Sequence, residues 1–350
     1  MEILSTGEKI KRARIYNGVT LKELCDDKIS ISKMSCIENG KVKADSEIIR
    51  YVADKIGVDF DYLIEDVYEQ IVNNLNSIKK ITKKDYSFEE NVEHNLEYAV
   101  EYGYFDLAFE LMHILFTYYL EEKKWDAIQL IISQYYDLYQ KTQSKETIVT
   151  YFTDMGEYLF KNKECTEAIA YYSRLREIFS KEGIDDKSTY AFIVYKEGIC
   201  YLKLNNNENA YKLLSESIKN IEYINDNITK GKIYHSYALV CIKLKYNEAK
   251  EYIEKTFQCQ KDDSVLVATS KGNYGEAYFT VGNREEAMSE IEDGIRLFPK
   301  DKKEKYVEFL IQCINVLINN GEYKKAYELS NESLDLAIAT NDMRLVEHAY

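Results

Sequence analysis

A small residue recurs about every forty positions through most of this sequence, and that period constrains the fold more than any other feature. The residue follows a short acidic or polar turn each time, at Ala127, Ala168, Ala210, Ala249, Ala287 and Ala326, with spacings of 41, 42, 39, 38 and 39. Gly156, Gly198 and Gly275 stand twelve positions before three of these alanines, where two facing helices must approach closely. The period predicts helix pairs that stack on their neighbours and bury a shared core.

The composition favours helices throughout. The 350 residues include one proline, Pro299, and 14 glycines, too few chain breakers for an all-β fold with frequent turns. Hydrophobic residues make up 45% and charged residues 30%, which excludes a disordered chain. No apolar run approaches the roughly 18 residues of a membrane span. We therefore predict an all-α protein of about two domains that does not bind membranes.

The sequence shows no motif for catalysis or cofactor binding. The seven cysteines form no C-x-x-C pair and the four histidines are scattered, so neither a disulfide framework nor a zinc site is predicted. Motifs for phosphate binding and nucleophilic hydrolysis are absent. The N-terminus runs directly into charged residues rather than a signal peptide. We expect a cytoplasmic protein with reduced cysteines, no metal, no cofactor and no enzymatic activity.

Acidic residues are unevenly distributed along the chain. Residues 1–64 hold 11 basic and 11 acidic residues, whereas residues 65–350 hold 35 basic and 49 acidic residues. DNA is densely anionic, so it should repel the acidic part and accept a neutral module with one basic face. Any DNA-binding role therefore belongs to the first 64 residues.

Hydrophobic spacing divides residues 1–64 into five short helices. Their predicted ranges are Gly7–Tyr16, Thr20–Cys25, Ser30–Asn39, Ser46–Ile56 and Asp59–Ile64. Thr20 and Glu23 predict a capping box, and Ser30 predicts the cap of the third helix. Two short helices joined by a tight turn make a helix-turn-helix.

Three stretches of this segment resemble the Cro/repressor-type (XRE) DNA-binding domain: 7–10 (GEKI), 18–24 (GVTLKEL) and 32–41 (SKMSCIENGK). The turn at 26–29 is one residue shorter than the usual form. The RRNPP group of peptide-responsive regulators from Gram-positive bacteria often has the same shortened turn. The alternative interpretation is a small helical domain that docks on protein.

The resemblance implies how the segment would contact DNA, because in such domains the third helix enters the major groove and flanking loops hold phosphates. The positions expected to face base edges are Ile31, Ser32, Lys33 and Cys36. The expected phosphate anchors are Lys41, Lys43 and the backbone of Thr20. Arg14 and Glu38 match positions that form a structural ion pair between the first and third helices of the family.

The repeats resemble tetratricopeptide (TPR) repeats. The best copy contains Gly275, Tyr278, Gly282, Ala287, Ile291, Gly294 and Pro299. We predict linker helices at 65–102 and a repeat domain of about six helix pairs at 103–350, with a further helix begun before Tyr350. The resemblance implies a right-handed superhelix whose concave surface binds peptides.

TPR positions that face inward map to residues that could bind a peptide: Asp154, Glu157, Tyr195, Lys196, His235, Asn273, Glu276, Gln312 and Asn315. Asn and Gln can pair with both the N–H and C=O groups of an extended peptide. About half of these positions are expected to be ordinary solvated groove residues. His235 in particular is expected to be a polar surface residue rather than a switch.

An XRE domain followed by TPR-like repeats is the architecture of the RRNPP group, named for Rgg, Rap, NprR, PlcR and PrgX. Residues 12–18 and 21–25 look like its clostridial, RstA-like branch. The resemblance implies a homodimer that reads a pseudo-palindromic operator and binds a short signalling peptide that modulates DNA binding. One alternative is a TPR adaptor that sequesters another regulatory protein. A third hypothesis is a phosphatase that acts through groove carboxylates such as Glu157 and Glu276.

Overall fold

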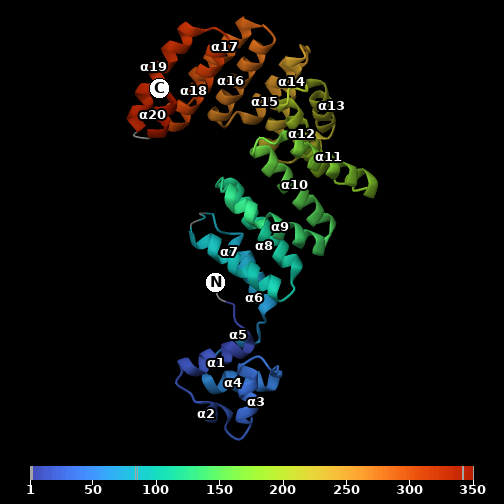
Figure 1. Ribbon diagram of the computed structural model, residues 1–350, viewed down its shortest axis with the longest axis vertical. Coiled ribbons are helices and arrows are strands. Elements are labelled where there is room, and N and C mark those ends of the chain that lie inside the picture. Colours follow the sequence, from blue (N-terminus) through green and yellow to red (C-terminus); the bar gives the residue numbers. More distant parts are fainter. Residues whose placement is uncertain (1–2, 83, 85, 341–342, 350) are drawn as a thin grey trace. The chain divides into compact units, whose positions relative to one another are not determined.

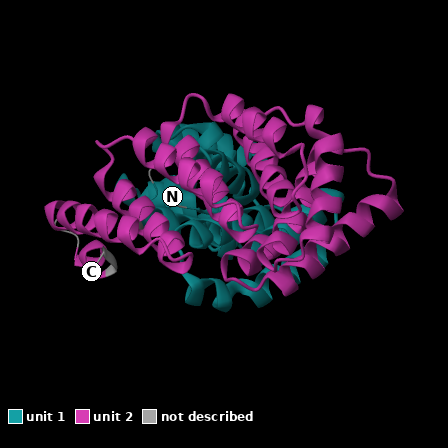
Figure 2. Cartoon of the chain, turned by 90° about the horizontal axis from the view of Figure 1, so that it is seen from above, with its two compact units in different colours: residues 1–154 teal, residues 155–350 magenta. Residues whose placement is uncertain are grey.

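The computed structural model describes residues 3–82, 84, 86–340 and 343–349, and within these ranges every regular element is a helix (Figure 1). This confirms the predicted all-α class. The chain divides into two compact units, Met1–Asp154 and Met155–Tyr350 (Figure 2). The predicted boundaries at residues 64 and 102 both lie within the first unit, so they remain predictions.

The head, residues 3–64, contains α1 to α5. These are α1 (Thr6–Tyr16), α2 (Leu21–Cys25), α3 (Ile31–Glu38), α4 (Ser46–Ile56) and α5 (Phe60–Ile64). They pack around a core that includes Ile10, Leu24, Met34 and Val52. The five helices lie within one or two residues of the predicted ranges.

Side-chain caps explain where the head's helices begin. Thr20 and Glu23 form the predicted capping box at α2, and the Ser30 hydroxyl accepts from the Lys33 N–H at the start of α3. A second capping box, formed by Ser5 and Glu8 at α1, was not predicted from the sequence. These local bonds satisfy N–H groups that a helix leaves unpaired in its first turn.

Two buried polar side chains lie where the head meets the next helix, α6 (Val67–Ile78), and one of them, Gln70, joins α6 to the head. The Gln70 amide accepts from the Leu4 N–H at 3.0 Å and donates to the Leu4 carbonyl at 2.8 Å. Lys9 is 1% exposed and donates to the Tyr62 carbonyl at 2.7 Å and to the Glu65 carbonyl at 2.8 Å. Such bonds fix geometry because a buried ammonium is costly to leave unpaired. We call these four bonds the Lys9–Gln70 junction.

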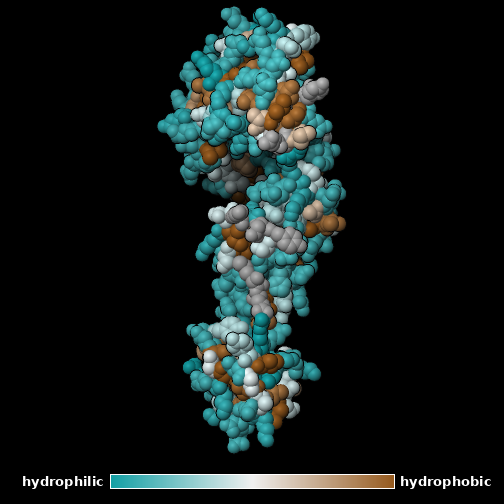
Figure 3. Space-filling model, turned by 90° about the vertical axis from the view of Figure 1, so that its left-hand side faces the viewer, coloured by the Kyte–Doolittle hydropathy of each residue, from teal (hydrophilic) through white to brown (hydrophobic). Residues whose placement is uncertain are grey.

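The remaining helices of the first unit follow α6. They are α7 (Tyr86–Glu101), α8 (Phe105–Glu121), α9 (Trp125–Thr142) and the first part of α10 (Lys145–Lys161). Helices α6 and α7 lie within 65–102, the range for which linker helices are predicted. No helix in the described ranges is both long and apolar enough to cross a bilayer. The face in Figure 3 is mainly hydrophilic, with scattered hydrophobic patches.

The second unit continues the alternation of paired helices. Its complete helices are α11 (Cys165–Glu182), α12 (Lys187–Lys203), α13 (Asn207–Lys219), η1 (Ile221–Tyr223), α14 (Asn227–Lys243), α15 (Ala249–Gln260), α16 (Ser264–Thr280), α17 (Arg284–Leu297), α18 (Lys303–Asn319), α19 (Tyr323–Thr340) and α20 (Met343–Ala349). Among the described residues, α8 to α19 lie within 103–350, the range for which about six helix pairs are predicted.

The three repeat glycines lie where helices touch, as predicted. A Cβ atom on Gly275 would stand 2.5 Å from Ile291 and 2.9 Å from the Ala287 carbonyl. On Gly198 it would stand 2.9 Å from Leu214, and on Gly156 it would overlap a tyrosine ring. Glycine is required at these positions because helix packing leaves no space for a side chain. The forty-residue period therefore located three positions where neighbouring helices are in close contact.

Candidate functional site

The predicted recognition helix, α3, has one buried and one exposed face. Met34 and Ile37 are buried in the head core, while Ser32 and Lys33 are exposed and Ile31 is 49% exposed. Cys36 lies on the same helix and is half-buried. An exposed isoleucine at a helix start is the kind of side chain that can contact a thymine methyl group. Of the four side chains expected to face base edges, three lie exposed in the N-terminal turn of α3, and Cys36 lies further along the helix and is half-buried.

An ion pair holds α3 against α1, as the resemblance implied. Arg14 Nε lies 2.6 Å from Glu38 Oε1 and Arg14 Nη2 lies 3.0 Å from Glu38 Oε2. Arg14 also donates to the Val19 carbonyl at 3.0 Å. The hydrogen bond to Glu38 raises the pKa of Arg14. A bidentate pair of this kind fixes the orientation of one helix against the other.

The expected phosphate anchors differ in availability. Lys41 and Lys43 are exposed in the loop after α3, with the Lys41 N–H held by the Cys36 carbonyl at 2.8 Å. The Thr20 N–H donates to the Glu23 carboxylate at 2.8 Å, and the Thr20 hydroxyl donates to the same oxygen at 2.7 Å. The capping box thus already engages the Thr20 N–H, and the role of Thr20 as a phosphate anchor stays a prediction.

Six of the nine predicted groove residues line two adjoining cavities of the second unit. A cavity of about 530 Å³ is lined by residues of α12, α14 and α16 that include Tyr195, His235, Asn273 and Glu276. A second, of about 210 Å³, shares Asn273 and Glu276 and adds Gln312 and Asn315 of α18. We call these two cavities together the groove. It presents amide side chains along its length, as peptide recognition requires.

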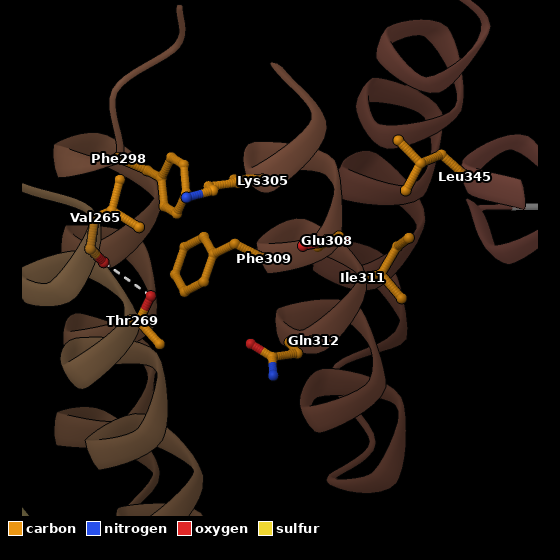
Figure 4. Close-up of a pocket in the computed structure, with 9 residues that line it drawn as sticks. All are labelled: Val265, Thr269, Phe298, Lys305, Glu308, Phe309, Ile311, Gln312 and Leu345. Carbon is orange, nitrogen blue, oxygen red and sulfur yellow. Dashed lines mark hydrogen bonds between the residues drawn. The ribbon is translucent and has the colours of Figure 1, made fainter. Parts of the chain in front are cut away.

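A third cavity, of about 530 Å³, adjoins the α18 end of the groove (Figure 4). It shares Phe309 and Gln312 with the second cavity. The rings of Phe298 and Phe309 stack with centroids 5.0 Å apart beside Lys305. The Thr269 hydroxyl donates a hydrogen bond to the Val265 carbonyl of the same helix. Phe298 and Phe309 are themselves only 2% and 4% exposed, so they support this cavity from below, and its accessible lining includes Lys305, Glu308 and Gln312.

His235 is not the polar surface residue expected from the sequence. Its ring is half-buried beside Tyr274, with ring centroids 4.9 Å apart, and Asn273 Nδ2 lies 3.2 Å from Nε2. Its Nδ1 is enclosed without a hydrogen-bond partner among the described residues. Burial lowers the pKa of His235 to about 4, so the ring is neutral near pH 7. The groove thus contains a neutral imidazole with one unsatisfied ring nitrogen.

The other three predicted residues are held by partners within the chain. Glu157 and Lys196 form an ion pair at 2.5 Å. Asp154 is buried, with its Oδ2 2.6 Å from His113 Nδ1 and 2.6 Å from the Tyr135 hydroxyl. The Asp154 carboxylate thus already has two partners within the first unit, on α8 and α9, and a role in peptide binding stays a prediction.

Two lysines in the groove were not predicted as ligands. Lys203 and Lys243 line the larger cavity, and Lys243 donates to the Asn205 side chain at 3.2 Å. Burial, opposed by Glu276, lowers the pKa of Lys243. The sequence did contain a signal, because both lysines end the first helix of a repeat exactly one period apart.

The features above define a class: a helix-turn-helix head followed by stacked helix pairs of the TPR type. No protein-family model matches the chain. A curated relative is the transcriptional activator NprA of Geobacillus stearothermophilus, 19% identical over 323 residues that cover 80% of this chain and 79% of NprA.

Solved structures share the fold. Apo NprR from B. thuringiensis has a TM-score of 0.52 at 15% identity, covering 81% of this chain and 80% of NprR. NprR in complex with its cognate peptide NprX has a TM-score of 0.51 at 17% identity, covering 80% and 81%. Aspartyl phosphate phosphatase F from Bacillus subtilis has a TM-score of 0.53 at 15% identity, covering 96% and 95%. The resemblance to the RRNPP group is thus confirmed at the level of the fold.

Proposed function

We propose that this chain is a transcriptional regulator of the RRNPP type, whose head binds DNA and whose groove binds a short signalling peptide. The observation that carries the proposal is the exposed N-terminal turn of α3, with Ile31, Ser32 and Lys33, in a head whose 11 basic and 11 acidic residues balance. The similarity to a transcriptional activator and to a peptide-bound NprR supports it. The placement in the clostridial branch stays a prediction.

In this proposal the protein binds a pseudo-palindromic operator as a homodimer. Two heads that read half-sites about one helical turn apart, or a multiple of it, respond strongly to small changes in their separation. A peptide that binds one arrangement of the dimer better than another shifts the population toward it and so changes operator affinity. The proposed contacts are Ile31, Ser32, Lys33, Cys36, Lys41 and Lys43 on DNA, and Tyr195, His235, Asn273, Glu276, Gln312 and Asn315 in the groove.

The test is to recover the chromosomal fragments that the full-length protein binds and to sequence them. We expect enrichment of a pseudo-palindromic sequence at moderate salt, and binding that weakens steeply as salt rises. Retention of all fragments alike would contradict sequence-specific binding. If residues 65–350 alone retained the physiological effect in cells, the adaptor alternative would replace the regulator.

A further inference from the structure

The larger cavity of the groove is a cationic site on an acidic body. Its ionised lining side chains are Lys203, Lys243 and Glu276, so it carries a net positive charge, whereas residues 65–350 have a net charge of −14. A lysine at a helix C-terminus is common because it complements the helix dipole. Lys243 is nevertheless half-buried, and Lys203 disfavours its charge while Glu276 favours it. One carboxylate thus faces two ammonium groups in this cavity, and a second anion would balance the charge.

Apolar side chains surround the two lysines. Phe160, Ile199, Leu202, Leu239 and Ala277 line the same cavity. A free peptide C-terminus on an apolar residue matches this combination, because its carboxylate and its side chain require a cationic and an apolar wall next to each other.

We propose that Lys203 and Lys243 bind the C-terminal carboxylate of the peptide, and that this contact sets the direction in which the peptide lies. This inference rests on the proposed peptide-binding function. The peptide's last side chain packs on Leu202 and Leu239, and its backbone runs along Asn273 toward Gln312 and Asn315 of α18.

The row of cavities also limits the length of the peptide. A ligand that extends from the larger cavity to the third cavity (Figure 4) crosses about two neighbouring helices. At about 10 Å between helix axes, this distance is roughly 20 Å. An extended chain advances about 3.3 Å per residue, so roughly six residues span this distance. The third cavity (Figure 4) then receives the N-terminal part of the peptide, beside Val265, Ile311 and Gln312.

The experiment compares peptides that differ only at the C-terminus. One library of random six- to eight-residue peptides is made as free acids, and the same library is made as C-terminal amides. Each is passed over immobilised full-length protein, and retained peptides are quantified by mass spectrometry. We expect at least tenfold more retention of free acids, with apolar residues enriched at the last position.

The variant Lys203→Gln with Lys243→Gln should retain peptides but lose the preference for free acids. A matched control, Lys219→Gln with Lys232→Gln, removes two charges from exposed positions of α13 and α14 and should keep the preference. Equal retention of acids and amides by the unaltered protein would overturn the inference while leaving peptide binding in place. Retention of neither library would overturn both peptide binding and the inference.

Discussion

At the scale of single residues, Asp154 shows why a side chain assigned to a groove can have a structural role. The sequence places it on an inward helix position, but the structure buries it against His113 and Tyr135. Burial alone would lower the pKa of His113, but the hydrogen bond and charge of Asp154 outweigh it, so the pKa is raised. The pair is therefore an ionised contact that depends on pH.

The contribution of this pair to stability should fade with rising pH. Because the pKa of His113 is higher in the folded than in the unfolded state, the stabilisation is fully present below about pH 6.5. It is lost as the pH rises through the folded-state pKa. The His113 side chain is 37% exposed, so solvent screening keeps the effect to roughly 0.5–1 kcal/mol.

We expect His113→Gln to lower the melting temperature more at pH 5.5 than at pH 9, as measured by circular dichroism. His94→Gln is the control, because the His94 ring packs on Tyr98 at 5.0 Å and is not paired with Asp154. An equal loss at both pH values would show that the charge of His113 does not contribute.

At the scale of elements, the close contact between α16 and α17 is the clearest result of the repeat pattern. Gly275 meets both the Ile291 side chain and the Ala287 backbone, and backbone cannot move aside as a flexible side chain can. A methyl group here must push the two helices apart.

Gly275→Ala should therefore destabilise this helix pair by roughly 1–3 kcal/mol. The control Gly282→Ala adds a methyl group where no atom lies within 4 Å, and it strains only a backbone with φ of +80°. That strain costs about 1 kcal/mol. We expect faster proteolytic cleavage within α16 and α17 for Gly275→Ala than for Gly282→Ala, because cleavage follows local opening. The reverse order would show that the contact is loose.

Local patterns predicted the elements better than they predicted the partners of individual side chains. The caps at Thr20 and Ser30 and the forty-residue period depend on residues close in sequence, and the structure reproduces them. The partners of Asp154 are 19 and 41 residues away on two other helices. Each position turns by about 100° around a helix, so a shift of one residue moves a side chain from groove to core. Whether a side chain faces the groove or the core depends on the angles between packed helices, which these local patterns do not contain.

At the scale of the whole molecule, the division of charge predicts how DNA binding should respond to salt. The head is neutral overall, so its affinity must depend on a few local cations, whereas the acidic residues downstream oppose approach to DNA. Lys41 and Lys43 are the exposed cations that follow α3.

Lys41→Ala with Lys43→Ala should weaken binding on every DNA sequence and reduce the slope of log affinity against log salt by about 1.8 per head. Ser32→Ala should instead relax preference at one or two base pairs and leave the slope unchanged. Fluorescence anisotropy with a recovered operator and a scrambled duplex separates the two effects. An unchanged slope in the double lysine variant would show that other groups neutralise the phosphates.

The Lys9–Gln70 junction has a mechanical consequence. Two of its hydrogen bonds join the backbone of Leu4, just before α1, to Gln70 in α6. The other two join Lys9 of α1 to the Tyr62 and Glu65 carbonyls at the end of α5. The head is therefore attached to α6 by side-chain hydrogen bonds as well as by the covalent chain. A displacement of α6 would therefore act directly on the segment that begins α1, and α1 is joined to α3 by the Arg14–Glu38 ion pair.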